Sequence, residues 1–194
     1  MRILNAAMKE FAQKGFKNAS TDVIVKEAAI SKGALFHYFN NKKDLFLFLY
    51  DYAIDIIKNG ILMKFNDDER DIFTRIRNGM MLKIEILIKY PEIYEFTTVA
   101  YMEESREVKS DLDSRNRGLI TGAQGFLYEG IDTSKFKEGI DVKRAIDIIT
   151  WTIESYTNKK MEKFGIISLN ELNLNDLLSE MNIYLEMLKK SFYQ

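Results

Sequence analysis

Cysteine is absent from the 194 residues, so the chain can form no disulfide, no thiolate metal site and no thiol nucleophile. Its single histidine, His37, also excludes the usual multi-histidine zinc sites. We therefore expect no metal, no cofactor, no catalytic residue and no enzymatic activity. A small hydrolase that uses Glu103 or Glu104 is a poor alternative, because no nucleophile–base pair is visible beside them.

Long apolar runs are missing as well. The longest strongly apolar run, Leu45 to Tyr50, is far shorter than the roughly 20 residues that a membrane-spanning helix needs. Met1 is not followed by the basic segment, apolar stretch and cleavage site of a signal peptide. We expect a cytoplasmic protein with no membrane partner.

Only one proline, Pro91, interrupts the chain, and apolar residues recur at a spacing of three to four nearly everywhere. We predict an all-α fold of about nine helices. An N-terminal three-helix helix-turn-helix domain, residues 1–48, is joined through a long fourth helix to an α-helical ligand-binding and dimerisation domain, residues 49–194. The expected helices lie at about 2–14, 21–29, 32–39, 42–65, 71–89, 91–102, 104–130, 141–164 and 173–192.

Charge is distributed unevenly, although the net charge is only −1. Residues 1–48 hold eight Lys/Arg against four Asp/Glu, a net +4, so the rest of the chain carries a net −5. A basic head on an acidic body is expected if only the head approaches a polyanion. Four extra lysines could equally be solvated surface, and charge alone does not decide between the two.

The pattern of residues 20–39 favours binding to a polyanion, because it predicts two short helices joined by a tight turn. The apolar residues that such a unit can bury against the first helix are Ile24, Ala28, Ile30, Leu35 and Phe39. The second helix of a helix-turn-helix enters the major groove, where small residues let the backbone come close and polar ones reach bases and phosphates. The candidate DNA-binding residues are Thr21, Ser31, Lys32, Gly33, Ala34, Phe36, His37, Tyr38 and Lys42.

The N-terminal sequence also resembles a known family. The segments Ile3-Leu4-Asn5-Ala6-Ala7, Phe11-Ala12-Gln13-Lys14-Gly15-Phe16 and Ile30-Ser31-Lys32-Gly33-Ala34-Leu35-Phe36-His37-Tyr38-Phe39, then Lys42 and Leu45-Phe46, are similar to the TetR-family DNA-binding signature. The match covers about residues 2–48 in order and with matching spacing. The resemblance implies that the candidate residues from Thr21 to Lys42 occupy positions from which family members contact DNA.

Three residues depart from that signature. Ala29 stands where the family usually has the turn glycine, so the turn must be made without a residue that is free at positive φ. Ala34 and Phe36 replace a commoner threonine and tyrosine, which removes two hydroxyl groups from the expected DNA surface. The first helix also begins almost at Met1, without the basic arm of some members.

The larger domain is predicted mainly by analogy. The last two helices are expected to form an intersubunit four-helix bundle in a homodimer. Candidate interface residues are Ile146, Ile149, Ile153, Met181, Tyr184, Leu185 and Leu188. Candidate ligand-binding residues, which suggest a cavity for an apolar or aromatic molecule, are Met81, Phe96, Tyr101, Phe126, Trp151 and Tyr156. Gly118, Gly122 and Gly125 fall on one side of a predicted helix and serve either close packing or a ligand.

The favoured function is a ligand-responsive transcriptional repressor that binds a palindromic double-stranded DNA operator as a dimer and is released by a small-molecule effector. A helical ligand-binding or scaffold protein whose head binds a partner other than DNA is the alternative. The sequence does not decide between repressor and activator.

Overall fold

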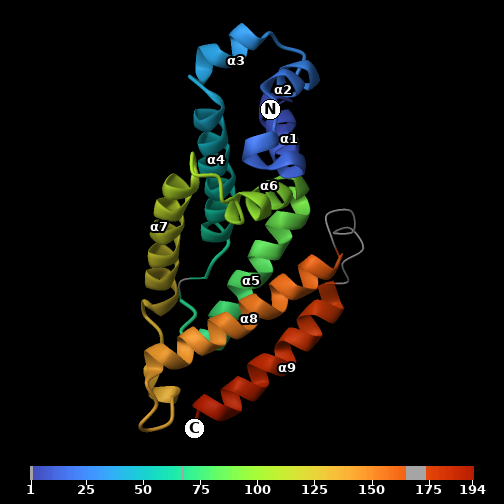
Figure 1. Ribbon diagram of the computed structural model, residues 1–194. Coiled ribbons are helices and arrows are strands. Elements are labelled where there is room, and N and C mark those ends of the chain that lie inside the picture. The colour runs from blue at the N-terminus through green and yellow to red at the C-terminus, as the bar shows by residue number, and fades with distance from the viewer. Residues whose placement is uncertain (1, 67, 165–173) are drawn as a thin grey trace. The chain divides into compact units, whose positions relative to one another are not determined.

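The computed structural model describes residues 2–66, 68–164 and 174–194, with only the backbone described for 120–128, 161–164 and 174. The described part is helical and contains no strand, which confirms the predicted fold class (Figure 1). The helices are α1 Arg2–Asn18, α2 Thr21–Glu27, α3 Lys32–Tyr38, α4 Lys42–Leu62, α5 Ile72–Lys89, α6 Pro91–Tyr101, α7 Lys109–Tyr128, α8 Val142–Phe164 and α9 Leu174–Phe192, with a 3-10 turn η1 at Thr133–Lys135. No described helix has the length and apolar character to cross a bilayer.

The packing divides the chain into two compact units. One comprises residues 1–63 and 86–122, and the other comprises residues 64–85 and 123–194. The predicted boundary after Phe48 falls inside α4 of the first unit, because Leu45, Phe46 and Leu49 are buried in the same core as α1. A division of function between residues 1–48 and 49–194 stays a prediction.

The core of the first unit is aromatic. Phe11, Phe16, Phe46 and Phe96 are almost completely buried, and their ring centroids lie 4.9 to 6.5 Å apart. Phe96 comes from α6, which packs against α1. Ring pairs at these distances and tilts stabilise the fold by more than the burial of their apolar area alone. The helix-turn-helix is therefore closed by α6 rather than being a free-standing three-helix domain.

Polar side chains join α4 to α7 in the same unit. Lys43 pairs with Asp111 at 2.8 Å. About two turns further along α4, the Tyr50 hydroxyl donates to the side-chain oxygen of Asn116. Burial of the Tyr50 phenol raises its pKa, so the hydroxyl stays protonated and keeps this bond. Asp51 follows with a two-pronged contact to Arg115 at 2.7 and 3.1 Å. α4 and α7 are thus held in register by specific bonds.

In the second unit, α8 and α9 lie side by side (Figure 1). The apolar side chains of both helices are buried; these are Ile146, Ile149, Ile153, Leu177, Met181 and Leu185. The Tyr156 hydroxyl donates to the Leu177 carbonyl at 3.2 Å and lies 3.2 Å from a Glu180 oxygen. The pair is therefore packed by an apolar seam with a polar tie at one place.

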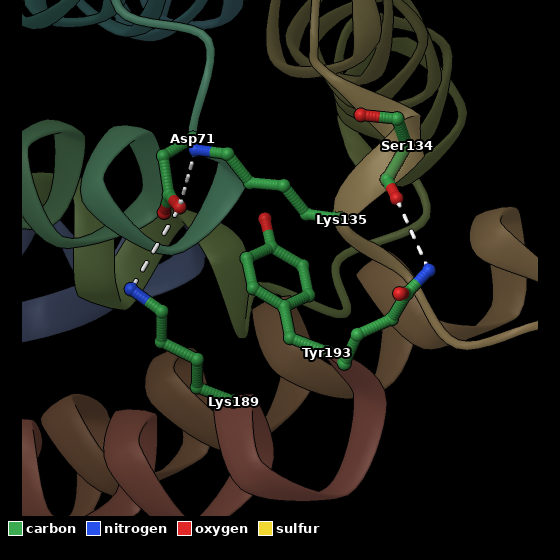
Figure 2. Close-up of a pocket in the computed structure, with 6 residues that line it drawn as sticks. Asp71, Ser134, Lys135, Lys189 and Tyr193 are labelled. Carbon is green, nitrogen blue, oxygen red and sulfur yellow. Dashed lines mark hydrogen bonds and ion pairs between the residues drawn. The ribbon is translucent and has the colours of Figure 1, made fainter.

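Asp71 anchors the start of α5 in the second unit (Figure 2). One of its oxygens accepts from the backbone N–H groups of Phe73 and Thr74, and the other faces Lys135 at 3.3 Å and Lys189 at 3.8 Å. Burial alone would raise the pKa of Asp71, but the Thr74 N–H and the two ammonium groups together hold it below its ordinary value. Asp71, Lys135 and Lys189 line a cavity together with Tyr193.

Candidate DNA-binding surface

The turn between α2 and α3 is made by Ala29 in the left-handed region, with φ 55°. Two backbone bonds close the end of α2: the Ile30 N–H donates to the Val25 carbonyl at 3.0 Å, and the Ala29 N–H donates to the Lys26 carbonyl at 3.2 Å. This is the Schellman arrangement, in which glycine usually occupies the left-handed position. The alanine therefore adopts the conformation that its glycine counterpart would adopt.

α3 is fixed at two points and otherwise exposed. Ser31 caps its start, because the Ser31 hydroxyl accepts from the Ala34 N–H at 3.0 Å. Leu35 is buried at 1% exposure in the core of the first unit. Of the other predicted contact residues on α3, Phe36 is half-buried, and the exposed ones are Lys32, Gly33, Ala34, His37 and Tyr38. One apolar anchor thus presents the rest of the helix to solvent.

Gly33 and Tyr38 show that the exposed side of α3 is not needed for packing. A Cβ atom at Gly33 would meet only the Ser31 hydroxyl, at 3.9 Å, so the chain itself does not require a glycine there. The Tyr38 side chain is 75% exposed and lies edge-on to the His37 ring. An accessible glycine backbone at Gly33, together with the exposed Tyr38 ring on the same helix, is typical of a surface that binds another molecule.

Lys32 and Thr21 lie at neighbouring helix starts. The Lys32 ammonium pairs with Asp22 of α2 at 2.8 Å, although both side chains are more than half exposed. Thr21 is half-buried at the first position of α2. The helix-turn-helix therefore brings the residues predicted at both helix starts onto one region of the first unit.

Lys42 has a structural role that its position in the sequence did not reveal. Its ammonium donates to the carbonyls of Lys17 and Ala19, both at 3.1 Å, and lies 4.9 Å from the centre of the Phe16 ring. Two of its three N–H bonds are thus used inside the chain. A phosphate contact by Lys42 stays a prediction that involves the remaining N–H.

Two carboxylates missed as site residues hold residues 16–20, which form the end of α1 and the connection to α2. Glu10, 7% exposed, accepts from the Ser20 N–H at 3.0 Å. Glu103, which follows α6, accepts from the Phe16 N–H at 2.8 Å with one oxygen and from the Ser105 N–H at 2.9 Å with the other. Glu10 could have been found as a charged residue on an apolar stripe. Glu103 could not, because its partner lies 87 residues away.

Residues 3–49 match the family model described as "Bacterial regulatory proteins, tetR family". The N-terminal region that holds the helix-turn-helix therefore matches the TetR family. The chain is 24% identical over 185 residues to the "Fatty acid metabolism regulator protein" of Bacillus subtilis, covering 92% of this chain and 93% of that one. It is 22% identical over 186 residues to the biofilm operon negative transcriptional regulator IcaR of Staphylococcus aureus, covering 95% and 98%.

A solved structure shares the fold over nearly the whole chain. It is the transcriptional regulator FadR from Bacillus subtilis in complex with stearoyl-CoA, at a TM-score of 0.69 and 22% identity, covering 97% of this chain and 96% of that one. This likeness shows the fold, while the match over residues 3–49 indicates a DNA-binding regulator, as the sequence predicted.

The predicted ligand-binding residues are divided between the two compact units. Phe96 belongs to the aromatic core of the first unit, and Tyr101 in the same unit is 68% exposed. In the second unit Met81 is half-buried, Tyr156 is tied to α9, and Trp151 is 64% exposed. The side chain of Phe126 lies outside the described residues, as do the predicted roles of Gly122 and Gly125. A Cβ atom at Gly118 would have nothing within 4 Å, so no described neighbour packs closely there.

Most of the predicted interface residues are inside the protomer. Ile146, Ile149, Ile153 and Met181 are fully buried, Leu185 is 5% exposed and Leu188 is half-buried, so only Tyr184 at 38% is exposed. The buried ones pack α8 against α9 and are not available to a partner. The apolar side chains that these helices leave exposed are instead Ile148, Trp151, Ile183, Tyr184 and Met187.

Proposed function

We propose that this protein is a TetR-family repressor that binds a palindromic operator as a homodimer and leaves DNA when a small apolar effector binds. The observation that supports DNA readout by α3 is its single buried anchor, Leu35, beside an exposed surface of small, basic and aromatic side chains. Because a helix-turn-helix inserts its second helix in the major groove, this surface fits base edges and phosphates. The scaffold alternative does not account for a bare Gly33 backbone beside Lys32.

A dimer is required by the geometry of operators. Two recognition helices must meet major-groove faces about 34 Å apart, which a single subunit cannot do. The exposed apolar residues of α8 and α9 support a two-fold contact through this outer face. Aromatic and Met side chains such as Trp151 and Met187 are typical of interface cores. We therefore propose an interface formed by the exposed apolar residues of α8 and α9 and not by the buried ones. The exposed residues are Ile148, Trp151, Ile183, Tyr184 and Met187.

The relatives support repression and an apolar effector. IcaR is named as a negative regulator, and the FadR structure holds stearoyl-CoA, which carries a long apolar chain. An effector of this kind suits the apolar residues predicted to bind it. Met81, Tyr101, Phe126, Trp151 and Tyr156 remain candidate contacts, and Phe96 is the least accessible of the predicted set because it lies in the aromatic core.

The release mechanism uses the rigid contacts of the first unit. α4 runs without interruption from Lys42 to Leu62 and is bonded to α7 at three places. At its start, Lys42 holds the carbonyls of the segment that leads into α2. An effector that displaces α7 or α4 therefore has to displace this segment, and α3 with it. Allostery requires that the effector binds one of two conformations more tightly than the other. Here these are the conformations before and after the displacement of α3.

Selection of bound sequences from random duplexes tests the proposal directly. We expect an inverted repeat, and a decrease of log K with log salt whose slope is on the order of −5 for six phosphate contacts per dimer. Substituting both His37 and Tyr38 by alanine should abolish the enrichment. The operator proposal fails if no duplex is enriched, or if that double variant binds as the unmodified protein does.

A further inference from the structure

Asp22 is an unexpected residue on the surface that faces DNA. Its side chain is 71% exposed, and its carboxylate lies 2.8 Å from the Lys32 ammonium, which is itself 53% exposed. An ion pair between two such exposed side chains contributes little to folding stability. The fold therefore does not depend on this pair, while a carboxylate at this place opposes the approach of any phosphate.

The pair changes the charge of α3. Lys32 is the one residue of this helix that is always positively charged, because the other six are Gly33, Ala34, Leu35, Phe36, His37 and Tyr38. Asp22 neutralises that charge in the free protein. A lysine without such a partner binds phosphate oxygens on any sequence, since they carry no base information.

We infer that Asp22 determines specificity: it keeps Lys32 away from phosphates and leaves it to a guanine edge. This inference rests on the proposed operator function. An ammonium group has three N–H donors, so Lys32 can keep its bond to Asp22 and still donate to the neutral O6 and N7 acceptors of guanine. At a phosphate the same arrangement places two anions side by side. Asp22 thus weakens binding to all duplexes, and weakens it most where no guanine is present.

The test compares Asp22→Asn with Glu107→Gln, which removes the same charge from an exposed residue of the first unit. Affinities are measured for the selected operator and for a random duplex over a range of salt concentrations. For Asp22→Asn we expect random-duplex affinity to rise about fivefold to tenfold and operator affinity to rise less than about twofold. The salt slope on random duplex should steepen by about 2 per dimer, one phosphate for each freed lysine.

A double variant shows whether Asp22 acts through Lys32. In a Lys32→Gln background, Asp22→Asn should leave the ratio of operator to random affinity unchanged. Asp22 also lies in the first turn of α2, but a loss of helix stability would lower both affinities together and leave their ratio unaltered.

Two results would overturn the inference. Equal gains on both duplexes, as expected for Glu107→Gln, would mean that Asp22 acts only as a distant charge. A loss of operator affinity with random affinity unchanged would mean that Asp22 itself reads a base, such as the amino group of cytosine. Failure of the unmodified protein to bind any duplex would instead contradict the operator function on which the inference rests.

Discussion

Replacing Ala29 by glycine should stabilise this protein. Ala29 adopts φ 55° at the end of α2, and its side chain is exposed, so the substitution removes a strained Cβ without removing a buried contact. An L-residue in the left-handed region is disfavoured by roughly 1–2 kcal/mol. Glycine loses about 0.5–1 kcal/mol more backbone entropy on folding than alanine does. The difference is a net stabilisation of up to about 1.5 kcal/mol, and of about 0.7 kcal/mol at the middle of both ranges.

The assay is thermal unfolding at fixed protein concentration, because the stability of a dimer depends on concentration. For a chain of this size, about 1 kcal/mol corresponds to a rise in Tm of roughly 2–4 °C. The matched control is Ala28→Gly. Ala28 is buried at 1% exposure and has an ordinary helical φ of −73°, so glycine should lower Tm there.

The two neighbouring substitutions should therefore have opposite signs. If Ala29→Gly lowers Tm as Ala28→Gly does, the positive φ of Ala29 does not strain the folded protein. The same result would mean that the two backbone bonds from Ala29 and Ile30 do not depend on the conformation at Ala29.

Three further substitutions have defined outcomes. Gly15→Ala should destabilise the protein by about 1–3 kcal/mol in urea unfolding, because Gly15 has φ 67° and ψ 174°, and a Cβ there would lie 3.3 Å from a Glu103 oxygen; unchanged stability would contradict this. Glu103→Gln should cost about 1–3 kcal/mol and speed hydrogen exchange at the Phe16 amide, because one amide oxygen cannot replace two carboxylate oxygens bonded to the N–H groups of Phe16 and Ser105; unaltered exchange would show that the bond is dispensable. Tyr193→Phe should change stability by no more than about 1 kcal/mol in either direction, because the buried Tyr193 hydroxyl makes no hydrogen bond of good geometry in the described part of the chain, although burial and the nearby Asp71 raise its pKa; a clear loss of stability would show that the hydroxyl bonds to Asp71.

Helix positions and the helix-turn-helix were predictable because local patterns set them. The apolar spacing in residues 20–39 correctly predicted that Ile24, Ala28 and Leu35 are buried. Ser31 was expected on the DNA-binding surface, yet its hydroxyl caps α3, which is a role that its position before the helix also permits. Local sequence defines such caps, but it does not show whether a hydroxyl is used within the chain.

The interface residues were less predictable because α8 and α9 are apolar on more than one side. In α8, Ile149 is fully buried while Ile148 is 42% and Trp151 is 64% exposed. A single helix with apolar residues around much of its circumference does not reveal which stripe packs within the protomer. The position of the neighbouring helix decides which side is buried, and the sequence of α8 does not reveal that position.

The stretch of chain that leads into the helix-turn-helix is held by side chains from three parts of the chain. Residues 16–20, at the end of α1 and in the connection to α2, are held by Glu10 from α1, Lys42 from α4 and Glu103 from the connection after α6. Each of these side chains bonds to backbone groups, so the segment cannot shift without breaking a charge-assisted hydrogen bond, which is stronger than a neutral one. Because α2 begins directly after this segment, a movement of α4 or of the Glu103 connection changes the position of α2 or breaks these bonds. The helix-turn-helix is therefore positioned by elements that lie beyond its own sequence motif.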